Sequence, residues 1–290
     1  MAEGGFGRSF PSNMSKDALS GLASQTSPFG DVTENRLGNA LNAEAGTAIS
    51  HWSAAVTGCL LSRRRAHCTD GRVEQRVCHK GARVFDIGAH VGDRTASFLR
   101  LGASVVALEP QPRVFRALRL LHGRAPAAVL LPWAVGKGTG EVTLYLNTRN
   151  PTVATVAPEF IDAATGAQGW EDQVWDDSIV VPVTTLDVLI ARYGVPAFVK
   201  IDVEGHEADV LAGLSTAVAA LSFEFTTIQR PVAHACIDRL CELGRYRFNL
   251  SLGEDHALRH KTWLTADALR AELDALPDAA NSGDVYAKLR

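Results

Sequence analysis

The sequence has few cysteines and no excess of basic residues. Its 5 cysteines are an odd number spread over 290 residues, which favours reduced thiols over a disulfide framework. The formal net charge is -3 at pH 7, which excludes the strongly basic surface with which many proteins bind nucleic acid. The same charge excludes dependence on an anionic membrane surface. We therefore expect no nucleic-acid partner and no membrane partner.

The sequence also lacks long apolar runs. The most apolar stretches, such as Ala125–Val135, contain proline and are far shorter than the roughly 18 residues of a membrane-spanning helix. The first residues, Met1–Phe10, carry glycine and glutamate where a signal peptide has a basic start and an apolar segment. These features predict a cytoplasmic protein.

Three regions of the chain differ in composition. Residues 1–44 are rich in glycine, serine, asparagine and threonine, which predicts a flexible N-terminal arm. Apolar residues recur with helical spacing between Ala45 and Leu61, so residues 45–80 are expected to form a helical extension. Residues 81–290 have the pattern of a folded domain. The arm and the extension could mediate a homodimer, and the alternative is that they lie on the domain.

From residue 81 onward, short apolar strands alternate with amphipathic helices. The predicted strands of the main sheet span 83–87, 104–108, 129–131, 197–201 and 221–225, and the helices span 94–101, 111–121 and 207–214. Residues 141–146 are expected to form a hairpin-like run, and residues 246–252 and 285–289 a closing antiparallel pair. Repeated strand–helix units predict an α/β fold with a doubly wound, mostly parallel sheet and a C-terminal antiparallel strand pair.

Acidic residues end several of the predicted strands. Asp86, Glu109, Asp202 and Glu224 all lie at or just beyond a strand end. In doubly wound sheets, ligands bind beyond the carboxyl ends of the strands, where the strand order reverses. Carboxylates gathered at one edge repel one another, so we expect a ligand or a cation there.

The turn after the first strand, Gly88-x-x-x-Gly92, allows the backbone to approach a ligand closely. It lacks the Gly-x-Gly-x-x-Gly pattern that binds a pyrophosphate, and the carboxylate of Asp86 would repel one. Glu109 follows Gly88 by about twenty positions, the spacing at which a carboxylate accepts the hydroxyl groups of a ribose. A nucleoside that carries an ammonium group and no phosphate, S-adenosylmethionine (SAM), fits both acids.

Residues 200–207 have the sequence Lys-Ile-Asp-Val-Glu-Gly-His-Glu. With this segment above all, and with Val84–Thr95, Ala107–Pro110, Val181–Asp187, Val210–Gly213 and Phe223–Glu224, the chain resembles the FkbM family of SAM-dependent methyltransferases. The resemblance covers about residues 81–289, and His90 stands where the family usually has asparagine.

The resemblance implies a class I methyltransferase fold. It also implies methyl transfer to a hydroxyl group of a sugar or of another small molecule in natural product biosynthesis. The methionine end of SAM would lie against Asp86, Gly88 and His90, the ribose would be held by Glu109, and Ala134 and Val135 would flank the adenine. The complete set of predicted cofactor-binding residues is Asp86, Gly88, His90, Gly92, Glu109, Pro110, Ala134 and Val135.

The turn after the predicted strand 197–201 is crowded with polar side chains. Methyl transfer needs the acceptor atom, the methyl carbon and the sulfur in line, and an alcohol acceptor must also lose a proton. Asp202, Glu204 and His206 are therefore the predicted catalytic residues. Asp202 follows an apolar strand and so needs a partner. The alternatives are that Glu204 and Glu207 cap the start of the next helix and that His206 is an exposed residue there.

A divalent cation is a weaker hypothesis for the same acids. Asp202, Glu204 and Glu224 could bind Mg²⁺, which would orient an acceptor diol and lower the pKa of its hydroxyl groups.

Residues 147–179 are predicted to form a long loop that contains Trp170 and Trp175. Long loops in compact domains are commonly lids or binding loops, so we interpret this one as a cover for the acceptor. A surface insertion is the alternative. Trp133 and Trp263 are expected to pack in the core.

Two other function classes stay open. One is an NAD(P)-linked oxidoreductase on the same sheet, against which Asp86 and the missing glycine pattern argue. The other is a non-catalytic SAM-binding module. The sequence does not specify the acceptor, nor whether the methyl group goes to oxygen or to nitrogen.

Overall fold

The computed structural model describes residues 79–253 and 257–290. The predicted arm at 1–44 and nearly all of the predicted extension at 45–80 lie outside these residues. Within the described part of the chain, no helix is long and apolar enough to cross a membrane. Cys236 and Cys241, the two cysteines in this part, are free thiols, as expected.

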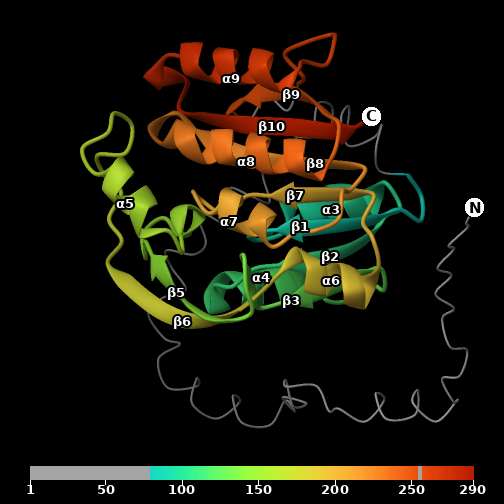
Figure 1. The fold of residues 1–290 in the computed structure, drawn as a ribbon. Coiled ribbons are helices and arrows are strands. Elements are labelled where there is room, and N and C mark those ends of the chain that lie inside the picture. The colour runs from blue at the N-terminus through green and yellow to red at the C-terminus, as the bar shows by residue number, and fades with distance from the viewer. Residues whose placement is uncertain (1–78, 254–256) are drawn as a thin grey trace, which may run out of the picture. The chain divides into compact units, whose positions relative to one another are not determined.

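A seven-stranded sheet forms the centre of the fold, with the order β3-β2-β1-β7-β8-β10-β9 (Figure 1). Its strands are β1 (Arg83–Ile87), β2 (Ser104–Leu108), β3 (Ala128–Leu131), β7 (Phe198–Ile201), β8 (Ala220–Thr226), β9 (Tyr246–Leu252) and β10 (Ser282–Leu289). The first five in the spatial order are parallel, whereas β10 runs antiparallel to both β8 and β9. This confirms the predicted fold class.

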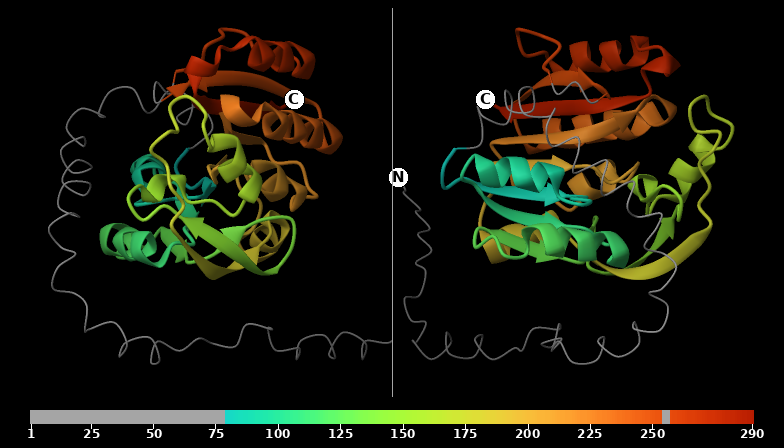
Figure 2. Two further views of the ribbon diagram at one scale, coloured as in Figure 1. Left: turned by 90° about the vertical axis from the view of Figure 1, so that its left-hand side faces the viewer. Right: turned by 180° about the vertical axis from the view of Figure 1, so that it is seen from behind.

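Helices cover both faces of the sheet. Seen from behind in Figure 2, α3 (Asp93–Arg100) and α4 (Pro112–His122) lie in front of the strands. The helices of the opposite face are α6 (Leu186–Tyr193), α7 (Glu207–Ala212), α8 (Arg230–Leu243) and α9 (Ala266–Ala275). Neighbouring side chains of a strand point to opposite faces. In β1, Val84 accordingly packs with α3 and α4, whereas Phe85 packs in the opposite cluster.

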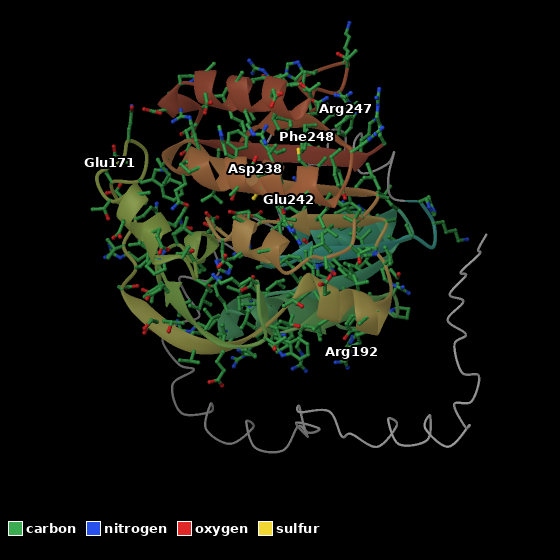
Figure 3. The ribbon with its side chains drawn as sticks, in the orientation of Figure 1. Glu171, Arg192, Asp238, Glu242, Arg247 and Phe248 are labelled. Carbon is green, nitrogen blue, oxygen red and sulfur yellow. The ribbon has the colours of Figure 1, made fainter. Side chains whose placement is uncertain are left out.

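The outer face of α8 is charged. Asp238 and Glu242, both labelled in Figure 3, lie along this helix. Asp238 pairs with Arg270 of α9, and Glu242 pairs with Arg239 at 2.8 Å. Such exposed pairs are typical of a solvated helix face and indicate no binding site by themselves.

A smaller sheet is inserted between β3 and β7, with the order β4-β6-β5. Its strands are β4 (Ala134–Val135), β5 (Gly140–Leu146) and β6 (Asp177–Thr184). The predicted hairpin-like run at 141–146 does form a strand, but its antiparallel partner is the later strand β6.

The segment 147–179 is more ordered than the predicted loop. It contains α5 (Pro158–Ala164) and the first residues of β6. Phe160, Trp170 and Trp175 pack against one another there, with ring centroids 5.1 Å and 6.0 Å from that of Phe160. The prediction of a plain loop was wrong because this small apolar cluster gives the segment a core of its own.

Candidate active site

A cavity of about 430 Å³ opens at the carboxyl ends of β1, β2, β7 and β8. The strand order reverses between β1 and β7, so the cavity lies where doubly wound sheets bind ligands. Its lining includes seven of the eight predicted cofactor-binding residues: Asp86, Gly88, His90, Glu109, Pro110, Ala134 and Val135. The lining also includes the predicted catalytic and metal-binding residues, Asp202, Glu204, His206 and Glu224.

The turn after β1 presses against the end of β7. Gly88 has φ +76°, and a Cβ atom at this position would lie 1.7 Å from the backbone oxygen of Asp202. His90 follows with φ +50°, and its backbone N–H donates to Glu109 Oε2 at 3.0 Å. Histidine shares with asparagine an enrichment in left-handed conformations, which explains how His90 fits at a position where asparagine is usual.

Gly92 lies outside the lining of the cavity. It is the N-cap of α3 with φ +95°, and a Cβ atom there would lie 2.4 Å from His122 Cδ2 on α4. The geometry gives Gly92 a role in packing α3 against α4.

Asp86 is a buried carboxyl group among the residues that line the cavity. The side chain is 0% exposed, and Thr95 Oγ1 donates to its Oδ2 at 2.6 Å. Its Oδ1 has no hydrogen-bond partner among the described residues. Burial raises the pKa of Asp86 above its ordinary value, although the nearby Lys200 opposes this shift. A buried oxygen without a partner is suited to accept a hydrogen bond from a bound ligand.

Glu109 accepts hydrogen bonds from two backbone N–H groups beside the cavity. Its Oε2 accepts from His90, and its Oε1 accepts from the backbone N–H of Gln111 at 2.8 Å. Burial raises the pKa of this carboxyl group to about 7. Each carboxylate oxygen has a second lone pair, so both can still accept from a ligand hydroxyl group.

The segment after β3 forms the neighbouring side of the cavity. Ala134 and Val135 are buried in β4 and line it, as does Trp133. Trp133 was expected in the core. It packs against the edge of the core and also lines the cavity, so the prediction covers one of its two contacts.

The partner of Asp202 is Lys200, from the same strand end. Lys200 Nζ lies 2.5 Å from Asp202 Oδ2, and Glu224 also hydrogen-bonds Asp202. Burial opposes ionisation of Asp202, but the charge of Lys200 and these hydrogen bonds outweigh it and hold the pKa below its ordinary value. Asp202 is therefore an ionised carboxylate that already accepts two hydrogen bonds.

Glu204 has an uncommon backbone conformation. Its φ is +54°, and its carbonyl oxygen accepts from Thr155 Oγ1 at 2.6 Å. No hydrogen bond to its carboxyl group occurs within the described residues. Burial, followed by the charges of Asp202 and Glu207, raises its pKa well above the ordinary value. Positive φ at a residue other than glycine is often found at functional sites.

Neither of the two predicted capping residues, Glu204 and Glu207, caps the next helix: the N-cap of α7 is His206, and α7 has no side-chain cap hydrogen bond. Glu207 Oε1 accepts from the backbone N–H groups of Val203 and Gly205 at 3.1 Å and 3.3 Å. Its carboxyl group is buried, and burial raises its pKa to about 7. Glu204 lines the cavity instead.

His206 lies at the N-cap of α7, with its Nδ1 3.7 Å from Asp209 Oδ2. Its side chain is 15% exposed, so it is not the exposed residue of the alternative interpretation. Burial lowers its pKa, although Asp209 opposes this shift. Lys137 Nζ also contacts Asp209, at 3.1 Å, so His206 belongs to a small polar group beside the cavity.

Three carboxyl groups come close together in the lining of the cavity. Asp202, Glu204 and Glu224 each offer an oxygen atom, and these atoms lie within 4.8 Å of one another. Burial raises the pKa of Glu224 well above its ordinary value, and the charges of Asp202 and Glu204 add to this shift. Proximity of carboxyl groups alone does not identify a metal site.

One strand that sequence reasoning did not assign to the site, β10, contributes Ser282, Gly283 and Asp284 to the lining. Thr152, Ala154 and Val156 of the segment 147–179, which was interpreted as a cover for the acceptor, also line the cavity. Trp170 and Trp175 do not line the cavity. Trp170 Nε1 instead donates to Asn281 Oδ1 at 3.0 Å, which ties the inserted segment to the start of β10.

Residues 86–248 match the family model described as "Methyltransferase FkbM domain". The matched range covers more than half of the chain. It contains both Asp86 and Glu224, which line the cavity.

A curated relative matches part of the same region. The chain is 27% identical over 158 residues to the hexuronic acid methyltransferase AglP of Haloferax volcanii. The alignment covers 53% of this chain and 57% of that protein, so the chain spans little more than half the length of this relative.

Solved structures of methyltransferases are also similar. One is precorrin-6y C5,15-methyltransferase from Geobacter metallireducens, with a TM-score of 0.34, 13% identity, and coverage of 72% of this chain and 82% of that one. Another is a TehB-like SAM-dependent methyltransferase from Corynebacterium glutamicum, with a TM-score of 0.36, 10% identity, and coverage of 81% and 99%. The strand order, rather than these low scores, defines the fold.

Proposed function

Since this chain belongs to the FkbM family of SAM-dependent methyltransferases, we propose that it transfers the methyl group of SAM to a hydroxyl group of a sugar or a sugar-like natural product. The observation that carries the proposal is the cavity itself, with Asp86 and Glu109 on one side and Asp202, Glu204 and Glu224 on the other. The sugar acceptor is suggested by the name of the relative from Haloferax volcanii, a hexuronic acid methyltransferase.

The residues at the cofactor side fit SAM. The free Oδ1 atom of Asp86 can accept a hydrogen bond from an ammonium group. The two oxygen atoms of Glu109 can accept from a pair of ribose hydroxyl groups, and Ala134 and Val135 offer apolar surface to a base. When bound, SAM supplies an electrophilic methyl group on a sulfonium. The protein must orient the acceptor, exclude water and remove a proton.

Glu204 is the residue that we assign to proton removal. Its carboxyl group faces the cavity and is free of hydrogen bonds within the described residues, whereas Asp202 is engaged by Lys200 and Glu224. A carboxylate that already accepts two hydrogen bonds is a weak base, and a raised pKa makes Glu204 a stronger one. Asp202 would orient the acceptor, and His206 would contact it from beside α7.

The proposal is tested by calorimetric titration of the protein with SAM and with its demethylated product, with and without Mg²⁺. We expect SAM to bind, and Glu109→Ala to abolish binding, because the ribose loses its acceptor and the two backbone donors lose their partner. An acceptor screen would then seek a mass increase of one methyl group. Absence of binding by either ligand would overturn the proposal. Binding without transfer to any acceptor would favour the non-catalytic module.

The affinity for SAM is expected to fall as the pH is lowered below about 7. Burial raises the pKa of Glu109 to about 7, so below that pH the group takes up a proton and loses acceptor capacity. The dissociation constant should rise by up to about tenfold per pH unit. Titrations between about pH 5.5 and about pH 8 would measure this. Glu109→Gln serves as the control, since it should bind weakly with no such pH dependence.

A further inference from the structure

Lys200 is a buried cation in the part of the cavity where Asp202, Glu204 and Glu224 come together. Its residue is 6% exposed, and its Nζ lies 2.5 Å from Asp202 Oδ2. Asp86 of β1 and Asp284 of β10 also face it. Negative charges from β1, from the end of β7 and from β10 thus act on one ammonium group.

The carboxyl groups of this part of the cavity outnumber the cations. We use "carboxylate cluster" for Asp86, Asp202, Glu204, Glu224 and Asp284, all of which line the cavity. The cations in the lining are Lys200 and Arg94 of α3. Arg94 also acts electrostatically on Asp86 and Asp202, but Lys200 makes the direct contact with Asp202.

The position of Lys200 bears on the metal hypothesis. A divalent cation would use oxygen atoms of Asp202, Glu204 and Glu224, which lie within 4.8 Å of one another. One oxygen atom of Asp202 already contacts the ammonium group of Lys200. A lysine ammonium group is a compact point charge with three donors, so it can serve as a counter-ion for such a group of acids.

We propose that Lys200 is a positioning residue that supplies the cation of the carboxylate cluster, so that Asp202 is held for the acceptor without a divalent metal ion. The proposal rests on the proposed methyl transfer for its functional meaning. It makes the lysine, rather than Mg²⁺, the permanent electrostatic partner of the acids. Removing the ammonium group would leave a group of oxygen ligands of the kind that binds a divalent cation.

The test compares Mn²⁺ binding by the full-length wild-type protein and by its Lys200→Ala variant. Electron paramagnetic resonance measures the bound Mn²⁺. We expect the variant to bind Mn²⁺ roughly tenfold or more tightly than the wild type, and Mg²⁺ to displace it. Equal binding by the two proteins, whether strong or absent, would overturn the proposal. The measurement needs no acceptor, so failure of SAM to bind would count against the proposed function alone.

Two further variants guard against misfolding of Lys200→Ala. Lys200→Met/Asp202→Asn removes both charges of the pair, so it should fold without gaining a Mn²⁺ site. Lys200→Arg keeps the positive charge, so it should retain the weak Mn²⁺ binding of the wild type. The proposal attributes weak Mn²⁺ binding to the positive charge at this position. It would be contradicted if Lys200→Arg bound Mn²⁺ as tightly as Lys200→Ala.

Discussion

Glu204→Gln is expected to lower kcat for methyl transfer by about 100-fold to 10,000-fold, the usual contribution of general acid–base catalysis. The amide keeps the size of the side chain but cannot accept the proton of the acceptor hydroxyl group. The backbone at this position is held at φ +54° and anchored by Thr155, so the substitution should leave the geometry of the cavity intact. Affinity for SAM should therefore change little. The measurement is single-turnover methyl transfer, with SAM binding followed separately.

A matched control for this variant is Glu141→Gln, which makes the same exchange at an exposed position of β5. It should retain the turnover of the wild type. If Glu204→Gln retains turnover and His206→Ala loses it, the proton acceptor is His206 and the assignment made here is wrong. Loss of turnover in Asp202→Asn alone would point to Asp202, in spite of its contact with Lys200.

Much of the main sheet follows from short-range pattern. β1, β2 and β9 have the bounds that the sequence predicts, because each is a short apolar or alternating run ended by glycine, proline or a charged residue. The first helix and the last strand differ from prediction by one to three residues, as is usual where element ends depend on capping.

The inserted sheet was less accessible to sequence reasoning. β6 contains Pro182, and proline argues against a strand because it has no N–H to donate. The structure accommodates it because β4 pairs only with Val183 and Thr184, beyond the proline.

The helices α6 and α9 were also missed. Each begins after a threonine, Thr185 or Thr265, whose side chain accepts from the backbone three residues on, and this capping signal could have located both.

The candidate site was predictable as far as it depends on strand ends. Parallel strands bring their carboxyl ends to one edge, so Asp86, Glu109 and Asp202 had to lie close together. The contribution of β10 was not predictable in this way, because it depends on the register that sets Asp284 opposite Glu224. Lys200 could have been noticed, since a lysine inside an otherwise apolar strand needs a buried partner.

Gly88→Ala is expected to weaken SAM binding by about 100-fold, the equivalent of about 3 kcal/mol of backbone strain. A Cβ atom there would lie 1.7 Å from the backbone oxygen of Asp202, which no side-chain movement can relieve. The φ of +76° adds strain for any residue with a side chain. The turn would have to move away from β7, which separates Asp86 from Asp202 and opens the cavity. Calorimetry with SAM and urea denaturation would measure the two effects.

Two alanine variants separate the effect on the site from a general loss of stability. Gly138→Ala meets no atom within 4 Å and should behave as the wild type. Gly92→Ala also introduces strain, at φ +95°, but its Cβ atom would meet side-chain atoms of His122 and Leu118 rather than the backbone of β7. Its unfolding free energy should fall by at least about 1 kcal/mol, while the folded protein still binds SAM. If Gly92→Ala loses SAM as completely as Gly88→Ala, then Gly92 contributes to the cofactor site through the start of α3, and its position outside the cavity lining does not limit its role.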